Sequence, residues 1–381
     1  MATHSKKKET QKVWYKTASA YWLLPSFMLI AIINGLGITV KIQFYLRAVC
    51  YDYYSNKSQF ISTSFLLNPI NDYPDEWCNN ADVQAMTSRF LLILDLCSAV
   101  PAIFVLAPLG LLSDIKGRKI CLLIAVAGSI LTTLNILLVG NYIDTFGIYF
   151  LLVGALFDGI TGGLLSLISA SYAYATDCTS PTQRSVIFGW MQGAFFAGFI
   201  GPTIGGWIIE LTDNLLSVFY VMIAAIFLLY VTLVFKWSLV DQGYYFIILG
   251  VSRDNEEKHL RKYEVWILRF ALFIDVLAYA GYGLATSSSM FVVASVIASL
   301  GSVSGSVIKS LQTNLVAPSQ IGQLLGALCV LDSIGRIISP VVFNALYSIL
   351  VVTSPHLIWY GVTFLIAAAF LLSFGIVPKY N

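Results

Sequence analysis

The sequence predicts an all-α integral membrane protein that crosses the bilayer about ten times. Hydrophobic residues make up 58% of its 381 residues and charged residues only 11%, whereas soluble domains carry about 25% charged residues. So little charge cannot cover a water-exposed surface of this size, so we expect lipid to cover much of it. The net charge of +2 also argues against a nucleic-acid partner, which would require a basic domain.

Long apolar stretches recur along the whole chain. A helix needs about 20 mostly apolar residues to cross the hydrocarbon core of a bilayer. The predicted spans are 22–45, 88–111, 119–140, 147–172, 185–208, 215–237, 265–285, 290–313, 322–350 and 357–377. The stretch 243–250 is too short to cross, so we expect it to be interfacial or re-entrant.

Basic residues indicate the orientation of these spans. They gather in the N-terminal tail and after the second, fourth and sixth spans, which are segments on one side if the spans alternate. Since cytosolic segments are enriched in Lys and Arg, both termini are expected in the cytosol. The first apolar run is too long for a signal peptide and lacks a clear cleavage site, so residues 1–21 are interpreted as a cytosolic basic tail.

One long loop, roughly 48–87, is expected on the opposite side. Asn56 begins an Asn-Lys-Ser triplet there, which is either a glycosylation acceptor or a chance occurrence. Cys50 and Cys78 lie in the same loop and either form a disulfide, which an oxidising lumen permits, or stay separate thiols. The chain has no CxxC, zinc-ligand spacing, Walker loop, HExxH or GxSxG, so neither a metal site, a cofactor nor an enzyme is predicted.

The strongest local signal is GLLSDIKGRK, between the second and third spans. Its Gly110 lets a neighbouring helix approach closely, and Gly117 permits a tight turn. Asp114 and Arg118, followed by Lys119, stand at the membrane edge within reach of each other and of helix ends. An acidic side chain there can face the positive N-terminus of a neighbouring helix. This spacing is too specific for an ordinary basic turn.

The segment resembles the signature loop of the major facilitator superfamily. A second segment, YATDCTSPTQRSVIFG, contains Asp177 and Arg184. It resembles the loop after the fourth span in the branch of drug antiporters, tetracycline-resistance proteins and proton-coupled folate transporter-like proteins, especially the fungal members.

The fifth span carries a third segment, GPTIGG. Its residues Gly201, Pro202, Gly205 and Gly206 resemble the end of the antiporter motif of that branch. By themselves they predict a helix bent at proline with a packing face of small residues.

The resemblance implies two helical bundles with a central site, usually of six helices each. Here we expect a six-helix bundle at 22–237 and a shortened four-helix bundle at 265–381. The cytosolic linker 238–264, with 243–250 as an interfacial stub, occupies the place of the missing helix pair.

The resemblance also implies alternating access, with the signature loop as a conformational latch. Asp114 would face the N-terminus of the penultimate helix, and Arg118 would link to Asp177. The residues assigned to the latch are Gly110, Asp114, Gly117, Arg118, Lys119, Asp177 and Arg184.

Ionisable side chains within the spans are costly and indicate functional sites. Asp158 lies near the middle of the fourth span among glycines. It is either a carboxyl that exchanges a proton and so couples a proton gradient to solute movement, or a structural carboxyl hydrogen-bonded across helices. Asp95 and Lys41 either pair with each other or Lys41 extends to the outer interface.

Two further groups of charges lie in the second half. Asp332 and Arg336 are four residues apart and share one helix face, so they either neutralise each other or leave Arg336 to hold a solute or ion. Asp275 has no partner nearby in the sequence, and Arg336 is its candidate partner across helices.

We therefore expect a secondary active transporter of a small solute, coupled to protons and monomeric, in the plasma membrane or the vacuolar membrane. Its expected partners are a small-molecule solute, protons and the lipid bilayer. The alternative is a non-transporting member of the family that serves as a sensor, an assembly partner or an inactive remnant, because the second half is short. A membrane enzyme is less well supported, since no catalytic constellation recurs on one face.

Overall fold

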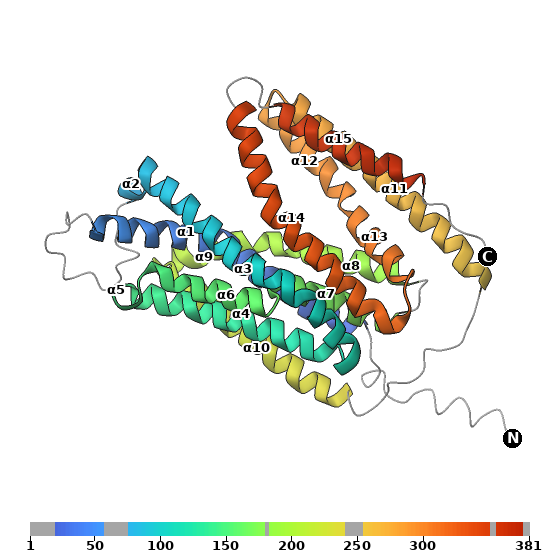
Figure 1. The fold of residues 1–381 in the computed structure, drawn as a ribbon, viewed down its shortest axis with the longest axis horizontal. Helices are drawn as coiled ribbons and strands as arrows, with labels where there is room; N and C mark the ends of the chain where they lie inside the picture. Colours follow the sequence, from blue (N-terminus) through green and yellow to red (C-terminus); the bar gives the residue numbers. More distant parts are fainter. Residues whose placement is uncertain (1–19, 57–74, 180–182, 241–253, 351–355, 376–381) are drawn as a thin grey trace.

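The computed structural model describes residues 20–56, 75–179, 183–240, 254–350 and 356–375 (Figure 1). Its regular elements within these ranges are helices. Ten of them, some interrupted, are long and apolar enough to cross a membrane. We call residues 20–240 the first half and residues 254–375 the second half.

The first half holds six spans. They are α1 (Ala20–Asn56), α3 (Ala81–Lys116), α4 (Arg118–Asn141), α6 (Leu151–Ile160) continued by α7 (Gly163–Asp177), α8 (Arg184–Phe196) continued by η3 (Ala197–Ile200) and α9 (Gly201–Thr212), and α10 (Leu216–Val240). The short helices α2 (Asp75–Cys78), α5 (Ile143–Phe146) and η2 (Ile148–Phe150) lie between them.

The second half holds four spans. They are α11 (Asp254–Leu284), α12 (Ser288–Gly301) continued by α13 (Val303–Thr313), α14 (Ile321–Leu350) and α15 (His356–Ser373), with the short η4 (Pro318–Gln320) before α14.

The expected linker 238–264 is shorter than predicted. Helix α10 continues to Val240 and α11 already begins at Asp254, so residues 254–264 are helical. A search for apolar stretches does not find these residues because many of them are charged. The acidic residues at the start of α11 do favour a helix N-terminus. The expected stub 243–250 lies outside the described residues.

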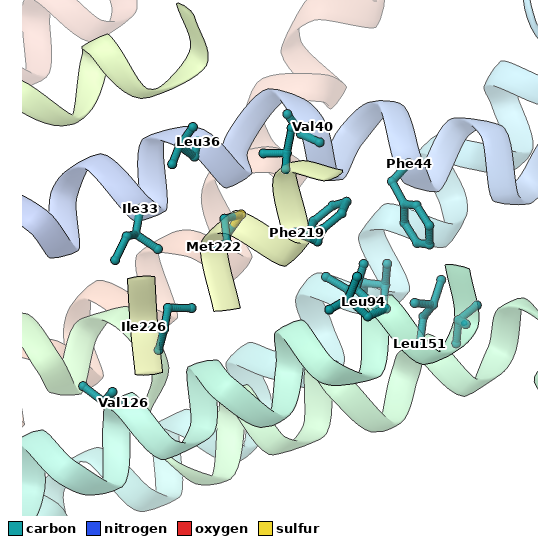
Figure 2. Close-up of a cluster of buried hydrophobic side chains, with 14 of the residues drawn as sticks. Ile33, Leu36, Val40, Phe44, Leu94, Val126, Leu151, Phe219, Met222 and Ile226 are labelled. Atoms are coloured by element: carbon teal, nitrogen blue, oxygen red, sulfur yellow. The ribbon is translucent and has the colours of Figure 1, made fainter. Parts of the chain in front are cut away.

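The core of the first half forms around one face of α1. Leu36, Val40 and Phe44 are four residues apart and therefore share that face, and all are almost completely buried. They pack toward α10, where Phe219 meets the ring of Phe44 edge-on with centroids 5.6 Å apart (Figure 2). This apolar packing holds the polar groups of the first half in fixed positions.

The span that holds the GPTIGG segment is interrupted just before it, whereas the sequence predicts a helix bent at proline. The 3₁₀ turn η3 precedes it, and Pro202 lies in the first turn of α9, where proline is tolerated. A Cβ built on Gly201 would lie 2.4 Å from the backbone nitrogen of Leu36, so α1 touches this backbone directly. Gly205 also faces α1, whereas a Cβ on Gly206 would meet no atom within 4 Å.

At the far end of α1, Cys50 and Cys78 form a disulfide, the first of the two alternatives above. It ties α2 to α1. Asn56 is the last residue of α1, but the rest of its triplet lies outside the described residues, so its glycosylation stays a prediction.

The two halves meet at one end of the molecule. There α14 packs against α3 and α7, and α13 packs against α8. In Figure 1 the second half diverges from the first toward the opposite end, where α2 and the C-terminal end of α14 lie far apart. We call the end at which these helices pack together the closed end. The contacts there hold the two halves together.

Candidate latch and intramembrane charge sites

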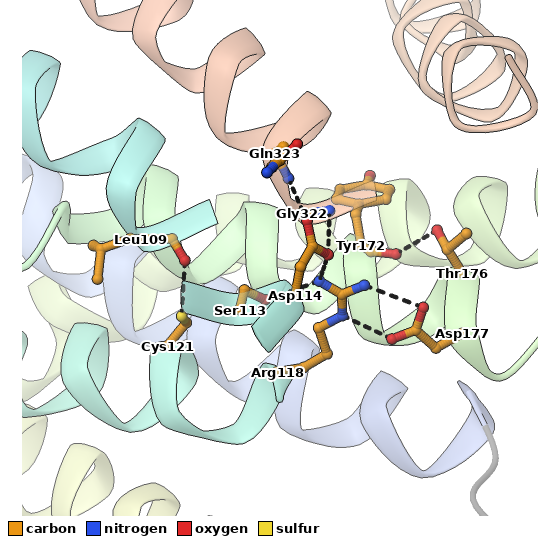
Figure 3. Close-up of polar contacts among 10 residues, drawn as sticks. All are labelled: Leu109, Ser113, Asp114, Arg118, Cys121, Tyr172, Thr176, Asp177, Gly322 and Gln323. Atoms are coloured by element: carbon orange, nitrogen blue, oxygen red, sulfur yellow. Dashed lines mark hydrogen bonds and ion pairs between the residues drawn. The ribbon is translucent and has the colours of Figure 1, made fainter. Parts of the chain in front are cut away.

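Asp114, in the last turn of α3, binds the N-terminus of α14 (Figure 3). Its two carboxylate oxygens accept hydrogen bonds from the backbone N–H groups of Gly322 and Gln323, both at 2.8 Å. These N–H groups have no partner within their own helix, and the positive end of the helix dipole favours a carboxylate. A side chain of the first half thus caps a helix of the second.

Arg118, at the start of α4, holds this carboxylate in place. Its Nη1 donates to Asp114 at 2.5 Å and its Nε donates to Asp177, at the end of α7, at 2.7 Å. The guanidinium is 9% exposed, and a buried cation requires such partners. We call Asp114, Arg118 and Asp177 with the first turn of α14 the latch. Burial raises the pKa of the neighbouring Cys178 thiol to about 11, whereas the Asp177 side chain is 38% exposed.

Two glycines of the signature segment are required by the backbone. A Cβ built on Gly110 would lie 2.3 Å from the carbonyl oxygen of Gly322, so the backbones of α3 and α14 touch. Gly117 adopts φ = 95°, which favours glycine and allows the sharp turn from α3 into α4. A latch role for Lys119, near the start of α4, stays a prediction.

Arg184 lies at the start of α8 and is buried. Its Nη1 donates to Asn314 Oδ1 at 2.5 Å and to the carbonyl oxygen of Thr313 at 3.3 Å. The sequence groups Arg184 with Asp114, but the structure brings Arg184 to the end of α13 rather than to α14. The closed end therefore has contacts at two places.

Asp158 lies beside a break in the fourth span. Helix α6 ends at Ile160 and α7 restarts at Gly163, and Gly162 and Gly163 both have positive φ. A Cβ built on Gly163 would lie 2.8 Å from both carboxylate oxygens of Asp158, so the N-terminus of α7 adjoins the carboxylate, which its dipole favours. Ser98 of α3 donates to Asp158 at 2.8 Å.

Asp158 also lines a cavity of about 140 Å³ inside the first half. Its polar lining comes from α1, α4 and α6: Asn34, Lys41, Ser129, Thr132, Thr133 and Asp158. A polar cavity of this size holds several water molecules.

Lys41 faces this cavity and interacts electrostatically with Asp158. Neither sequence alternative for Lys41, a pair with Asp95 or extension to the outer interface, includes this place beside the cavity and Asp158. Position along a helix gives depth, but the direction of a side chain around the helix depends on packing. Lys41 lies seven residues, two turns, after Asn34 and therefore points inward with it.

The remaining charges lie between α3, α13 and α14. Arg336 of α14 interacts electrostatically with Asp95 of α3, whereas Asp275, its expected match, lies beside Ser304 and Gly301. Asp332 of α14 interacts with Lys309 of α13, whose ammonium lies 4.4 Å from the ring centroid of Tyr172. The sequence favoured a pair in which Asp332 and Arg336 neutralise each other. In the structure each of them also has an opposite charge nearby on another helix, Lys309 for Asp332 and Asp95 for Arg336.

Asp275 of α11 packs against another helix break. It accepts a hydrogen bond from Ser304 at 3.3 Å. A Cβ built on Gly301 would collide with its carboxylate, at the point where α12 gives way to α13. Each half therefore has an aspartate packed against an interrupted helix.

Ten apolar spans arranged in two halves, with charged side chains between and within them, define an integral multi-pass membrane protein. Residues 59–244 match the family model of the Major Facilitator Superfamily. The match covers just under half of the chain, so this part of the sequence is similar to that superfamily.

Several curated relatives match part of the chain. The chain is 29% identical over 210 residues to the MFS-type transporter avaJ of Aspergillus versicolor, covering 55% of this chain and 39% of the relative. It is 34% identical over 131 residues to the class B tetracycline resistance protein of Escherichia coli, covering 34% of this chain and 30% of the relative. It is 27% identical to the proton-coupled folate transporter of Bos taurus, covering 34% of this chain and 28% of the relative. The matched part is thus at most about two fifths of these three relatives.

A solved structure resembles nearly the whole chain. The human organic anion transporter MFSD10 superimposes with a TM-score of 0.61 over 93% of this chain and 99% of that structure, at 15% sequence identity. At this identity the likeness concerns the fold alone.

Proposed function

We propose that this chain is a secondary active transporter that moves a small solute across a membrane by alternating access and couples that movement to protons. One observation carries the proposal: Asp114 of the first half caps α14 of the second half through two hydrogen bonds that separation of the halves would break. Because these bonds are few and polar, water can replace them when the halves part.

The structure then represents a state closed at the end that contains the latch. The Lys and Arg of the neighbouring segments favour a cytosolic position for this end, and both termini would be cytosolic as well. The divergence of the halves at the other end (Figure 1) would open a central site to the outside. The membrane would be the plasma membrane or the vacuolar membrane.

The solute would contact the charges between the halves. Asp95 and Arg336 lie on α3 and α14, and Lys309 and Asp332 on α13 and α14. Charged side chains at this depth are costly unless they are paired or hydrated. A small solute with a charged group would replace one partner of such a pair and so draw the two sides together.

The proton would bind Asp158 in the cavity of the first half. Its carboxylate has Lys41 and Ser98 as neighbours, so protonation removes a charge that three helices now compensate. The proton-coupled folate transporter, by its name, uses protons, and its similarity to this chain supports this assignment.

The experiment uses purified protein in vesicles with an imposed pH gradient and a screen of labelled small solutes. Wild type should accumulate at least one solute in response to the gradient, and D158N should lose that response while keeping exchange of the same solute. D213N is the matched control, because Asp213 is exposed at the end of α9 with φ = 48°, a conformation that asparagine tolerates.

The short second half, with four spans against six in the first, favours one other function, a non-transporting sensor or assembly partner. Such a protein would bind a solute without moving it. Saturable binding by wild type, with no movement in any direction across the vesicle membrane, would support this alternative and contradict the proposed transport.

A further inference from the structure

Glu264 is a buried acidic residue at the closed end that sequence analysis assigned to the linker. It lies on α11 and is 3% exposed. Its Oε1 accepts hydrogen bonds from Ser185 Oγ at 2.6 Å and from Ser310 Oγ at 3.1 Å. Ser185 belongs to α8 in the first half, whereas Ser310 belongs to α13 in the second. One carboxylate oxygen thus joins three helices from both halves.

Burial makes these hydrogen bonds important. A carboxylate removed from water loses much of its hydration energy unless donors replace the water, and hydroxyl donors to a charged oxygen form short, strong bonds. Ser310 and Thr313 are fully buried beside it. If the halves parted here, Glu264 would lose the Ser185 donor, and water would have to enter to replace it.

Arg184 strengthens the same place. It precedes Ser185 in the first turn of α8 and donates to Asn314 and to the carbonyl oxygen of Thr313. Thr313 is three residues after Ser310, so both lie on one face of α13. Two adjacent residues of the first half therefore hold α11 and α13.

We propose that Glu264 is the central residue of a second clamp, formed with Arg184, Ser185 and the end of α13, that keeps the two halves together at the closed end. It acts separately from the latch, because the latch holds α14 through a helix N-terminus, whereas the Glu264 clamp holds α11 and α13 through side-chain hydroxyls. The inference deepens the proposed function by naming a second contact that alternating access would break.

The test measures the distance between the two halves without any solute or proton gradient, so its outcome is independent of the transport experiment. Spin labels are attached through Lys116→Cys on α3 and Leu315→Cys after α13, both exposed. The four free cysteines are replaced beforehand, and the disulfide is kept. Distances are recorded in lipid nanodiscs by pulsed electron paramagnetic resonance.

Two serine variants separate the clamp from a role in packing alone. S185A removes the hydrogen bond between the halves, whereas S310A removes only a bond within the second half. We expect the fraction of molecules with separated ends to rise about tenfold in S185A, as for a lost hydrogen bond to a charged group, and to rise less in S310A. E264A should open the end at least as much as S185A, and E264Q, which keeps an acceptor oxygen, should open it less.

E210A, which changes an exposed glutamate of α9, is the matched control and should leave the distances unchanged. If E264A does not fold, the comparison of the two serine variants still decides. An unchanged distance distribution in S185A, or equal opening in S185A and S310A, would overturn the clamp.

Discussion

The Asp114 carboxylate and the backbone N–H of Gly322 lie 2.8 Å apart, although 208 residues separate them in the chain. This hydrogen bond makes the start of α14 depend on a side chain of α3. Loss of the negative charge should weaken the cap, because the dipole of α14 and the Arg118 guanidinium both attract a carboxylate.

We therefore predict that D114N and R118A each reduce the initial rate of solute transport by about tenfold, the effect of about 1.4 kcal/mol. Both proteins should still reach their membrane, which quantitative surface labelling would verify. K116A, which changes an exposed lysine in the last turn of α3, serves as the neighbouring control with the same loss of one charge. Full transport by both D114N and R118A would contradict the role of the latch.

A second prediction concerns the contact of α3 with α14. G110A places a methyl group against the carbonyl oxygen of Gly322 and should lower the free energy of unfolding by about 1–3 kcal/mol, as overpacking does. Thermal unfolding in detergent would measure it. G189A on α8, where a Cβ meets no atom within 4 Å, should be neutral or slightly stabilising. Equal stability of the two variants would show that the backbones do not touch.

The charges in the cavity of the first half give a third prediction. K41M or D158N alone leaves one charge at the cavity without the opposite charge, so each should lower the free energy of unfolding. The double variant K41M/D158N should recover most of that loss, because neither charge remains. A double-mutant cycle on thermal unfolding would measure the coupling, and strictly additive losses would show that the two groups do not interact.

The disulfide between Cys50 and Cys78 provides the fourth prediction. Replacing both residues by serine should reduce stability by about 2–4 kcal/mol, because the bond restricts the unfolded chain between α1 and α2. Reductant should lower the unfolding temperature of wild type to that of the variant and leave the variant unchanged. An effect of reductant on the variant would point to another cause.

The spans could be predicted from the sequence because length and apolarity alone decide whether a helix can cross a bilayer. The contacts of the signature segment could be expected because it resembles the signature loop of the major facilitator superfamily, and because a helix N-terminus favours an acidic side chain such as that of Asp114. The contacts of Asp114 with α14 and of Arg118 with Asp177 have the geometry that the motif implies.

The partners of the buried charges could not be predicted. Lys41 lines the same cavity as Asp158, because packing, which no local pattern records, sets the direction of each side chain around its helix. Glu264 escaped notice because its segment is too polar for a span, although it is helical and buried in the structure. The break at Gly162 was also missed, since glycines in a span are equally compatible with close helix packing.

Helix α14 follows α13 in the chain, yet it packs most extensively on α3 and only lightly on α15. By chain order α14 belongs to the second half, but by packing it belongs with α3 of the first half. The second half contacts the first along two surfaces, one between α3 and α14 and one between α8 and α13. Asp114 lies at the first and Arg184 at the second, so the proposed separation of the halves would have to break both contacts.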